Sequence, residues 1–279
     1  MIALHAKRSF NAIERFSQLR FHRLQQQKPL IVVLTGTDLY NDIRTDRKAQ
    51  KSIELADRLV VLQQMGIMEL PKELRKKTRV IYQSSVKLIK PMKLRRSISK
   101  RKRTFDVAVI GHLRQVKDPF RAALASRQLP ATSKVRILHL GSALDDKMKE
   151  KAQQEMVLNP RYRWLQKQPR GRTIKILSDS RLLVLSSRME GGANVISEAI
   201  IAGVPVLASK IPGNIGMLGT DYPGYFPVGD SNSLASLILR SENDPEFLKV
   251  LKQKLKLLVP RFKPEMEKSS LKKLLNEFY

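Results

Sequence analysis

Residues 189–199, Met-Glu-Gly-Gly-Ala-Asn-Val-Ile-Ser-Glu-Ala, constrain the fold more than any other part of the chain. Apolar runs at residues 181–187 and 204–209 flank them, so the pattern predicts a strand, a glycine turn, a helix and another strand. Such a turn directs unpaired backbone N–H groups and the positive end of a helix dipole toward an anion. Asn194 and Glu198, four residues apart, share one helical face. The segment is a candidate nucleotide-sugar site.

The rest of the chain alternates helix-like and strand-like patterns twice. In the first part, helical patterns cover residues 7–27 and 46–56, and apolar runs cover residues 29–34 and 58–62. In the second part, strands are expected near residues 105–110, 135–140, 162–165, 182–186 and 204–208. This alternation predicts an α/β fold with parallel sheets, in which the second part forms a Rossmann-like half. Two further helices are expected at residues 245–258 and 265–278.

A basic stretch divides the two parts. Residues 84–104 are rich in Lys and Arg and have little apolar periodicity, which is typical of a linker. We therefore expect an N-terminal domain with its linker at residues 1–103, a nucleotide-sugar-binding domain at 104–260, and a C-terminal helix at 261–279 that packs back on the first domain. Residues 2–5 look like the end of a strand, so the first domain is expected to lack its first strand, loop and helix, either because the fold is cut back here or because the chain begins at an internal start.

Charge and composition limit the function without choosing it. The chain of 279 residues has 53 Lys and Arg against 25 Asp and Glu, a net charge of +28, which attracts nucleotides, phosphates, nucleic acid or an acidic membrane. The absence of cysteine excludes disulfides, thiolate nucleophiles and thiolate metal sites. No apolar run approaches the roughly 20 residues of a membrane span, and no secretory signal is evident. A cytoplasmic protein is the expectation.

With these residues in view, the second half resembles glycosyltransferase family 4, retaining enzymes of the two-domain GT-B fold with a Glu-x7-Glu signature. Glu190 and Glu198 match that spacing. Four blocks, at residues 34–40, 111–114, 187–194 and 221–230, are similar to the selenosugar synthases of selenoneine biosynthesis. The resemblance covers roughly residues 3–240 and implies transfer of N-acetylhexosamine from a UDP-sugar to selenophosphate. The expected donor is UDP-N-acetylglucosamine. A carbon–selenium bond would form, UDP would be released, and no cofactor is implied.

The resemblance implies roles for the two carboxylates. Glu190 would lie near the donor sugar hydroxyls and act in catalysis, and Glu198 would bind the ribose, since a carboxylate accepts two hydroxyl hydrogen bonds. The alternative is that both are solvated helix-terminal residues. Gly191 and Gly192 would let the backbone approach a ligand, or they form a plain tight turn. The helix start would present the amides of Ala193, Asn194 and Val195, and Asn194 is also a candidate cap.

A second cluster follows the strand at residues 105–110. Family members carry Gly-Arg and a later Lys here, directed at the donor diphosphate. This chain has Gly111 and His112 at the first two positions, and Arg114 would supply the missing guanidinium beside Lys117. Cations at this place would neutralise the charge that builds on the departing pyrophosphate. The alternatives are two solvated cations and a packed histidine.

The opposite side of the expected cleft offers acceptor-binding residues. Thr35 stands where relatives that activate hydroxyl acceptors often carry His. A selenophosphate selenium is already anionic and polarisable, so it needs charge-complementary binding rather than a general base. The candidate acceptor-binding residues are His5, Lys7, Arg8, Thr35, Gly36, Thr37 and Asp38. The alternatives are that Lys7 and Arg8 are surface residues and that Thr37 and Asp38 cap a helix or a turn.

No Asp-x-Asp occurs and the four histidines are scattered in sequence, so we expect catalysis without a metal. Two other functions stay open. One keeps the donor but uses a hydroxyl acceptor on a lipid or polysaccharide, with the basic surface drawn to an acidic membrane. The other is a basic nucleic-acid-binding protein with a vestigial sugar site, favoured by the cations of residues 87–103, although no specific nucleic acid is expected. The sequence predicts no oligomeric state.

Overall fold

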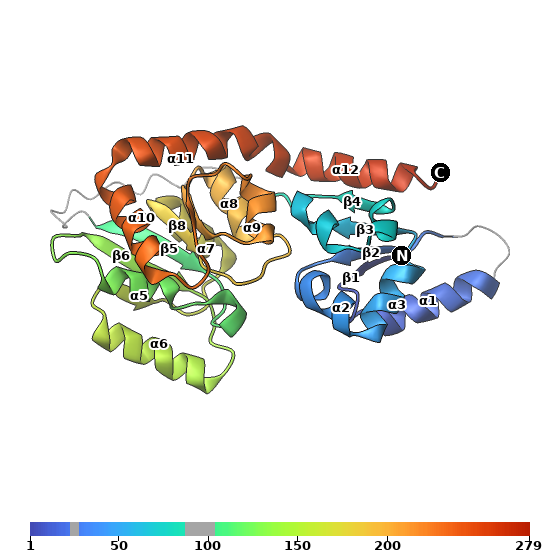
Figure 1. The fold of residues 1–279 in the computed structure, drawn as a ribbon, viewed down its shortest axis with the longest axis horizontal. Coiled ribbons are helices and arrows are strands. Elements are labelled where there is room, and N and C mark those ends of the chain that lie inside the picture. The colour runs from blue at the N-terminus through green and yellow to red at the C-terminus, as the bar shows by residue number, and fades with distance from the viewer. Residues whose placement is uncertain (23–27, 87–103) are drawn as a thin grey trace.

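A computed structural model describes residues 1–22, 28–86 and 104–279. Figure 1 shows two α/β halves side by side, with the C-terminal helices running along both of them. Most of the predicted basic linker, including the cations of residues 87–103, lies outside the described residues. None of the helices in the described ranges is long and apolar enough to cross a membrane.

The first half is built on a parallel sheet in the order β1-β2-β3-β4. Its strands are β1 (Ile2–Leu4), β2 (Ile31–Leu34), β3 (Arg58–Val61) and β4 (Thr78–Val80). Its helical segments are α1 (Phe10–His22), η1 (Asp38–Asp42), α2 (Ile43–Thr45), α3 (Arg47–Leu55), η2 (Gln64–Glu69) and α4 (Lys72–Arg75). Ile13 of α1 and Ile53 of α3 pack with Val32 of β2 in one hydrophobic cluster. The Asp46 carboxylate caps α3 by accepting the N–H groups of residues 48 and 49.

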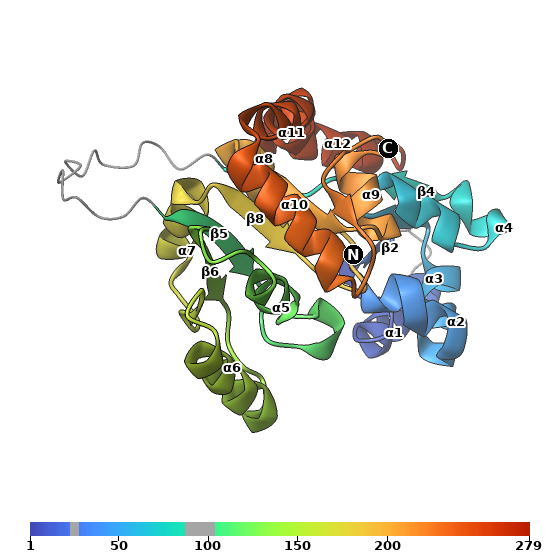
Figure 2. The ribbon, with the colours of Figure 1, turned by 60° about the vertical axis from the view of Figure 1, so that its left-hand side comes forward.

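The second half holds a six-stranded parallel sheet in the order β10-β9-β8-β5-β6-β7. Its strands are β5 (Phe105–Ile110), β6 (Val135–Leu140), β7 (Tyr162–Trp164), β8 (Leu182–Leu185), β9 (Val206–Ser209) and β10 (Tyr225–Phe226). Its helices are η3 (Gln115–Lys117), α5 (Arg121–Arg127), α6 (Asp146–Leu158), α7 (Arg170–Asp179), α8 (Asn194–Ala202), α9 (Pro212–Leu218), α10 (Ser231–Asn243) and α11 (Pro245–Leu258). Helices cover the sheet on both sides (Figure 2), and every residue of β8 and β9 is buried. Burial on both faces is what a parallel strand requires.

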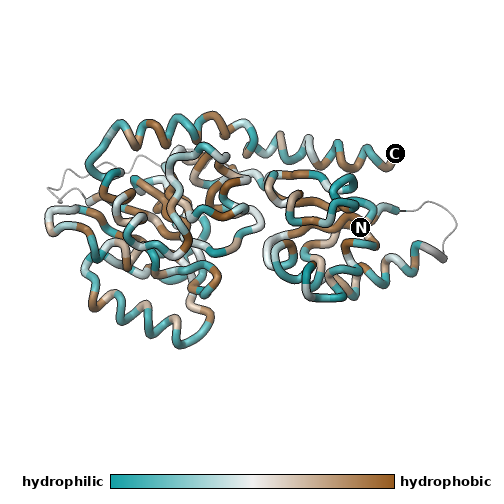
Figure 3. Tube along the Cα trace, viewed as in Figure 1, coloured by the Kyte–Doolittle hydropathy of each residue, from teal (hydrophilic) through white to brown (hydrophobic). Residues whose placement is uncertain are grey.

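The chain ends by returning to the first half. After α11, η4 (Val259–Phe262) leads into α12 (Pro264–Asn276), with prolines at the starts of both segments. Leu274 of α12 packs with Ile31 and Val60 of the first sheet, and the Glu277 carboxylate binds the guanidinium groups of Arg58 and Arg79. Figure 3 shows hydrophobic residues gathered along the strands of both sheets. The predicted α/β class with two parallel, Rossmann-like halves is confirmed.

Candidate active site

Loops from the carboxyl ends of strands in both sheets meet around one cavity. In parallel sheets these strand ends lie on a common edge, where α/β proteins bind ligands. The cavity has a volume of about 180 Å³. Its lining comes from the ends of β1, β2, β5 and β8, and includes His5, Arg8, Thr35, Gly36, Thr37, Arg114, Val116, Lys117, Met189, Glu190 and Gly191. Five of the seven predicted acceptor-side residues thus face the predicted catalytic residues across one cavity.

Glu190 is held by two donors at one of its oxygens. Its side chain is only 8% exposed, and Oε1 accepts from the Lys117 ammonium at 2.5 Å and from the Ser187 hydroxyl at 2.5 Å. Lys117 ends the short helix η3, next to Asp118, whose φ of +44° turns the chain sharply. Residues 73 apart in sequence therefore form a half-buried ion pair at the cavity. Ser187 was not among the predicted site residues.

The glycines beside Glu190 bring the two halves into direct contact. A Cβ atom on Gly191 would lie 2.2 Å from the carbonyl oxygen of Thr35, and one on Gly192 would lie 2.5 Å from the Leu62 Cβ. Gly36 adopts a φ of +155° and faces the Gly191 amide. The sequence predicted these glycines for ligand approach or for a tight turn. The structure gives them another role, because only glycine lets the backbones of the two halves meet here.

Helix α8 begins at Asn194, and the amide of Ile196 in its first turn donates to the Ala193 carbonyl oxygen at 2.9 Å. The amides of Asn194 and Val195 find no backbone acceptor among the described residues, as is usual at the start of a helix. Ala193 is the N-cap residue and makes no side-chain cap bond, so the predicted capping role of Asn194 is wrong: its side chain is exposed on the first helical position. Glu198, one turn later, is largely buried, and this burial raises the pKa of its carboxyl. Its nearest cation is Arg170 of α7, at 3.7 Å.

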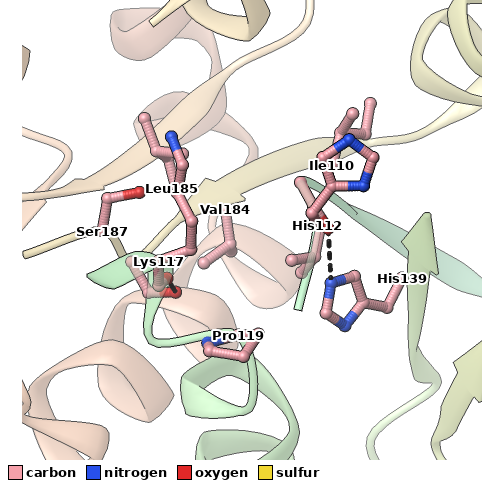
Figure 4. Close-up of a pocket in the computed structure, with 11 residues that line it drawn as sticks. Ile110, His112, Lys117, Pro119, His139, Val184, Leu185 and Ser187 are labelled. Atoms are coloured by element: carbon pink, nitrogen blue, oxygen red, sulfur yellow. Dashed lines mark hydrogen bonds between the residues drawn. The ribbon is translucent and has the colours of Figure 1, made fainter. Parts of the chain in front are cut away.

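A buried histidine forms a hydrogen bond with the loop after β5. His139 of β6 is 1% exposed, and burial lowers its pKa to about 4. The neutral ring must donate from Nε2 to the carbonyl oxygen of Gly111, 3.2 Å away, because a carbonyl can only accept. Nδ1 then accepts from the Tyr162 hydroxyl at 2.8 Å. Figure 4 shows His139 and Lys117 around the small cavity beside this loop, which has a volume of about 10 Å³.

His112 and Trp164 both make hydrogen bonds that stabilise the fold. His112 is exposed, and its Nδ1 accepts the backbone N–H of Ser142 at 3.1 Å. The indole of Trp164 is buried and donates to the carbonyl oxygen of Gly141 at 2.8 Å. Gly141 in turn packs its Cα against the Gly111 carbonyl, where a Cβ would lie only 1.9 Å away. These contacts fix the shape of the loop that carries Gly111 and His112.

On the acceptor side, His5 is buried in a strained backbone conformation. Its φ is +71°, which is uncommon for a residue with a side chain. Its Nε2 lies 3.0 Å from the Thr37 hydroxyl, and its ring nitrogens lie 3.9 Å from the carboxylates of Asp38 and Asp42. In the described part of the chain, the guanidinium groups of Arg8 and Arg114 have no ion-pair partner. Both cations line the cavity.

Lys7 and Asp38 lie apart from the cavity lining. Lys7 binds the Asp46 carboxylate at 2.9 Å, which agrees with its alternative as a surface residue. Asp38 is fully buried and accepts the backbone N–H groups of Ala6 at 3.0 Å, Thr35 at 2.9 Å and Gly36 at 2.8 Å. Both oxygens of its carboxylate already accept backbone hydrogen bonds, so Asp38 stabilises the turn and does not face an acceptor substrate. The described residues contain no group of three His, Asp or Glu side chains arranged for a metal ion.

Comparison with known proteins places the chain in a family. The model of the family "Glycosyl transferases group 1" matches residues 92–257, more than half of the chain, so the protein belongs to that family. A search of curated proteins finds no match.

Solved structures share the fold. HepE of Anabaena, crystallised with UDP and glucose, is 20% identical with a TM-score of 0.77 over 96% of this chain and 76% of its own. Sucrose-phosphate synthase of Thermosynechococcus elongatus is 18% identical, with a TM-score of 0.76 over 99% of this chain and 72% of its own. TarM of S. aureus, crystallised with UDP and α-GlcNAc-glycerol, is 18% identical, with a TM-score of 0.71 over 99% and 55% of the two chains. The predicted GT-B architecture is confirmed.

Proposed function

We propose that this protein is a retaining, metal-independent glycosyltransferase that transfers N-acetylhexosamine from a UDP-sugar to selenophosphate. The proposed donor is UDP-N-acetylglucosamine. The bond between the anomeric carbon and the UDP oxygen breaks, UDP leaves with the electron pair, and selenium forms the new bond to that carbon on the same face. The observation that carries the proposal is the small cavity with Arg8 from one half and Arg114 from the other. Two cations that have no carboxylate partner among the described residues suit two anionic substrates.

The donor is assigned from the second half. HepE was crystallised with UDP and with UDP-glucose, and TarM with UDP and α-GlcNAc-glycerol, which supports a UDP-sugar donor here. Lys117, Arg114 and the first amides of α8 would hold the pyrophosphate and stabilise its charge as it departs. In the described structure no group donates to Oε2 of Glu190, so this oxygen is free for a sugar hydroxyl. Glu198 would bind the ribose.

The acceptor is assigned from the first half. Selenophosphate brings an anionic nucleophile, so the site must bind charge rather than remove a proton. Arg8 would pair with the phosphate oxygens, and the hydroxyls of Thr35 and Thr37 would donate hydrogen bonds to them.

One observation favours the alternative of a hydroxyl acceptor. His5 lines the cavity beside two carboxylates, an arrangement that would let it accept a proton. The two functions separate in one assay: the purified protein is incubated with UDP-N-acetylglucosamine and selenophosphate, and the products are analysed by mass spectrometry. The proposal expects UDP and a selenosugar in equal amounts. A rate of UDP release that does not change with selenophosphate, but rises when a sugar or lipid alcohol is added, would favour the alternative.

A further inference from the structure

A chain of three buried polar side chains ends at Glu190. Asn214 of α9, Ser209 of β9 and Ser187, after β8, are each 0% exposed. The Asn214 amide donates to the carbonyl and hydroxyl oxygens of Ser209 at 2.9 and 3.1 Å, and the Ser209 hydroxyl donates to the Ser187 carbonyl oxygen. The Ser187 hydroxyl then donates to Oε1 of Glu190 at 2.5 Å. We call these three residues the serine relay.

The relay fixes which oxygen of Glu190 faces the cavity. Ser187 and Lys117 both donate to Oε1, from the buried side and from the β5 loop respectively. A carboxylate held at one oxygen by two donors cannot rotate freely about its last bond, so Oε2 keeps one direction. Lys117 is 30% exposed and binds the donor pyrophosphate in the proposed function. Ser187 is fully buried, and among the described residues its hydroxyl donates to Glu190 and to no other acceptor. Ser187 is therefore the donor that stays on Glu190 when substrate binds.

The other end of the relay rests on a helix that touches both halves. In α9, a Cβ on Gly213 would lie 1.9 Å from the Glu190 carbonyl oxygen, and one on Gly216 would lie 1.7 Å from the Gln63 side-chain oxygen of the first half. The Tyr82 hydroxyl, also from the first half, donates to the Gly216 carbonyl oxygen at 3.3 Å. The position of α9, and with it the relay, is thus set by the packing of the two halves.

We infer that Ser187 is a positioning residue, which aims Glu190 at the donor sugar through the serine relay. The inference rests on the proposed function in one respect only, the role of Glu190 at the sugar. It predicts that losing the Ser187 hydroxyl impairs turnover and leaves nucleotide binding intact, because the α8 amides and Glu198 do not depend on the relay.

The test compares Ser187→Ala and the nearly isosteric Ser187→Cys, whose thiol is a weak donor, with the wild type. Ser241→Ala is the matched control, since Ser241 is equally buried and, within the part of the chain that the structure describes, its hydroxyl bonds only to the Leu237 carbonyl oxygen of its own helix. UDP-release rates and the Kd for UDP are measured for each. Loss of a hydrogen bond to a charged group predicts a kcat lowered about 10- to 100-fold in both Ser187 variants, with the Kd for UDP changed less than about 2-fold.

The inference would be overturned if kcat of the Ser187 variants equalled kcat of Ser241→Ala. It would also be overturned if the Kd for UDP rose in step with the loss of kcat. A crystal structure of Ser187→Ala supplies a readout that needs no activity. A Glu190 carboxylate rotated away from its present direction supports the relay, and one unmoved on Lys117 refutes it. A wild-type protein that binds no UDP-sugar would refute the proposed function alone, and this structure would still decide the role of Ser187.

Discussion

Replacing Arg8 with Ala tests the assignment of the acceptor side. Arg8 lines the cavity without a carboxylate partner in the described structure, so its charge is available to an anion. Two unit charges about 4 Å apart attract by roughly 1 kcal/mol in water and roughly 4 kcal/mol at the effective dielectric of a protein surface. Arg8 is exposed, so a value near 2 kcal/mol is reasonable. We expect KM for selenophosphate to rise about 30-fold, with KM for the donor nearly unchanged.

The neighbouring cation provides the control. Lys7→Ala removes the same charge one residue away, but Lys7 is bound to Asp46 and does not line the cavity. Initial rates of UDP release are measured against selenophosphate concentration at low and at physiological ionic strength. The Arg8 effect should shrink as salt is added, because counterions screen exposed charges over about 8 Å at 0.15 M. Equal losses in the two variants, or an Arg8→Ala defect confined to the donor KM, would refute this reasoning.

Three further outcomes are expected. Glu190→Gln keeps the side-chain volume but removes the charge, and should lower kcat at least about 100-fold while the Kd for UDP, measured by calorimetry, stays constant. Gly191→Ala places a methyl group 2.2 Å from the Thr35 carbonyl oxygen, so the two halves must separate. We expect kcat/KM to fall sharply and small-angle scattering to show a larger radius of gyration. A radius of gyration equal to that of the wild type would count against the contact. His139 has its pKa lowered to about 4 from an ordinary 6.5, so the unfolded chain binds the extra proton between these values and stability falls as the pH drops through that window. Urea unfolding at pH 7 and pH 4 should show that the free energy of unfolding falls by up to about 3 kcal/mol because of His139, and the His139→Gln variant should not show this part of the decrease. An unchanged pH dependence in the variant would show that His139 is not responsible.

Long apolar runs made much of the fold predictable. β5, β6 and α11 match the expected residues 105–110, 135–140 and 245–258 at both ends, because burial on two faces or along one helical stripe leaves a clear pattern. β4 and β10 were not predicted, since β4 has one apolar residue in three and β10 has only two residues in all. Their pairing depends on neighbouring strands that only the tertiary fold supplies.

The site was predictable in composition and less so in geometry. The motif indicated Glu190 and Lys117 separately, and the structure brings them into contact. The roles of Asp38 and Gly191 depend on which surfaces meet, which no local pattern records. Ser187 carried one usable signal: a hydroxyl at the end of an apolar strand, three residues before Glu190, is buried and needs a partner.

A crystal structure with a bound UDP-sugar tests the central claim most directly. The account predicts the pyrophosphate at the first amides of α8 beside Lys117 and Arg114, with a sugar hydroxyl on Oε2 of Glu190. A pyrophosphate bound elsewhere, with this cavity left empty, would contradict it.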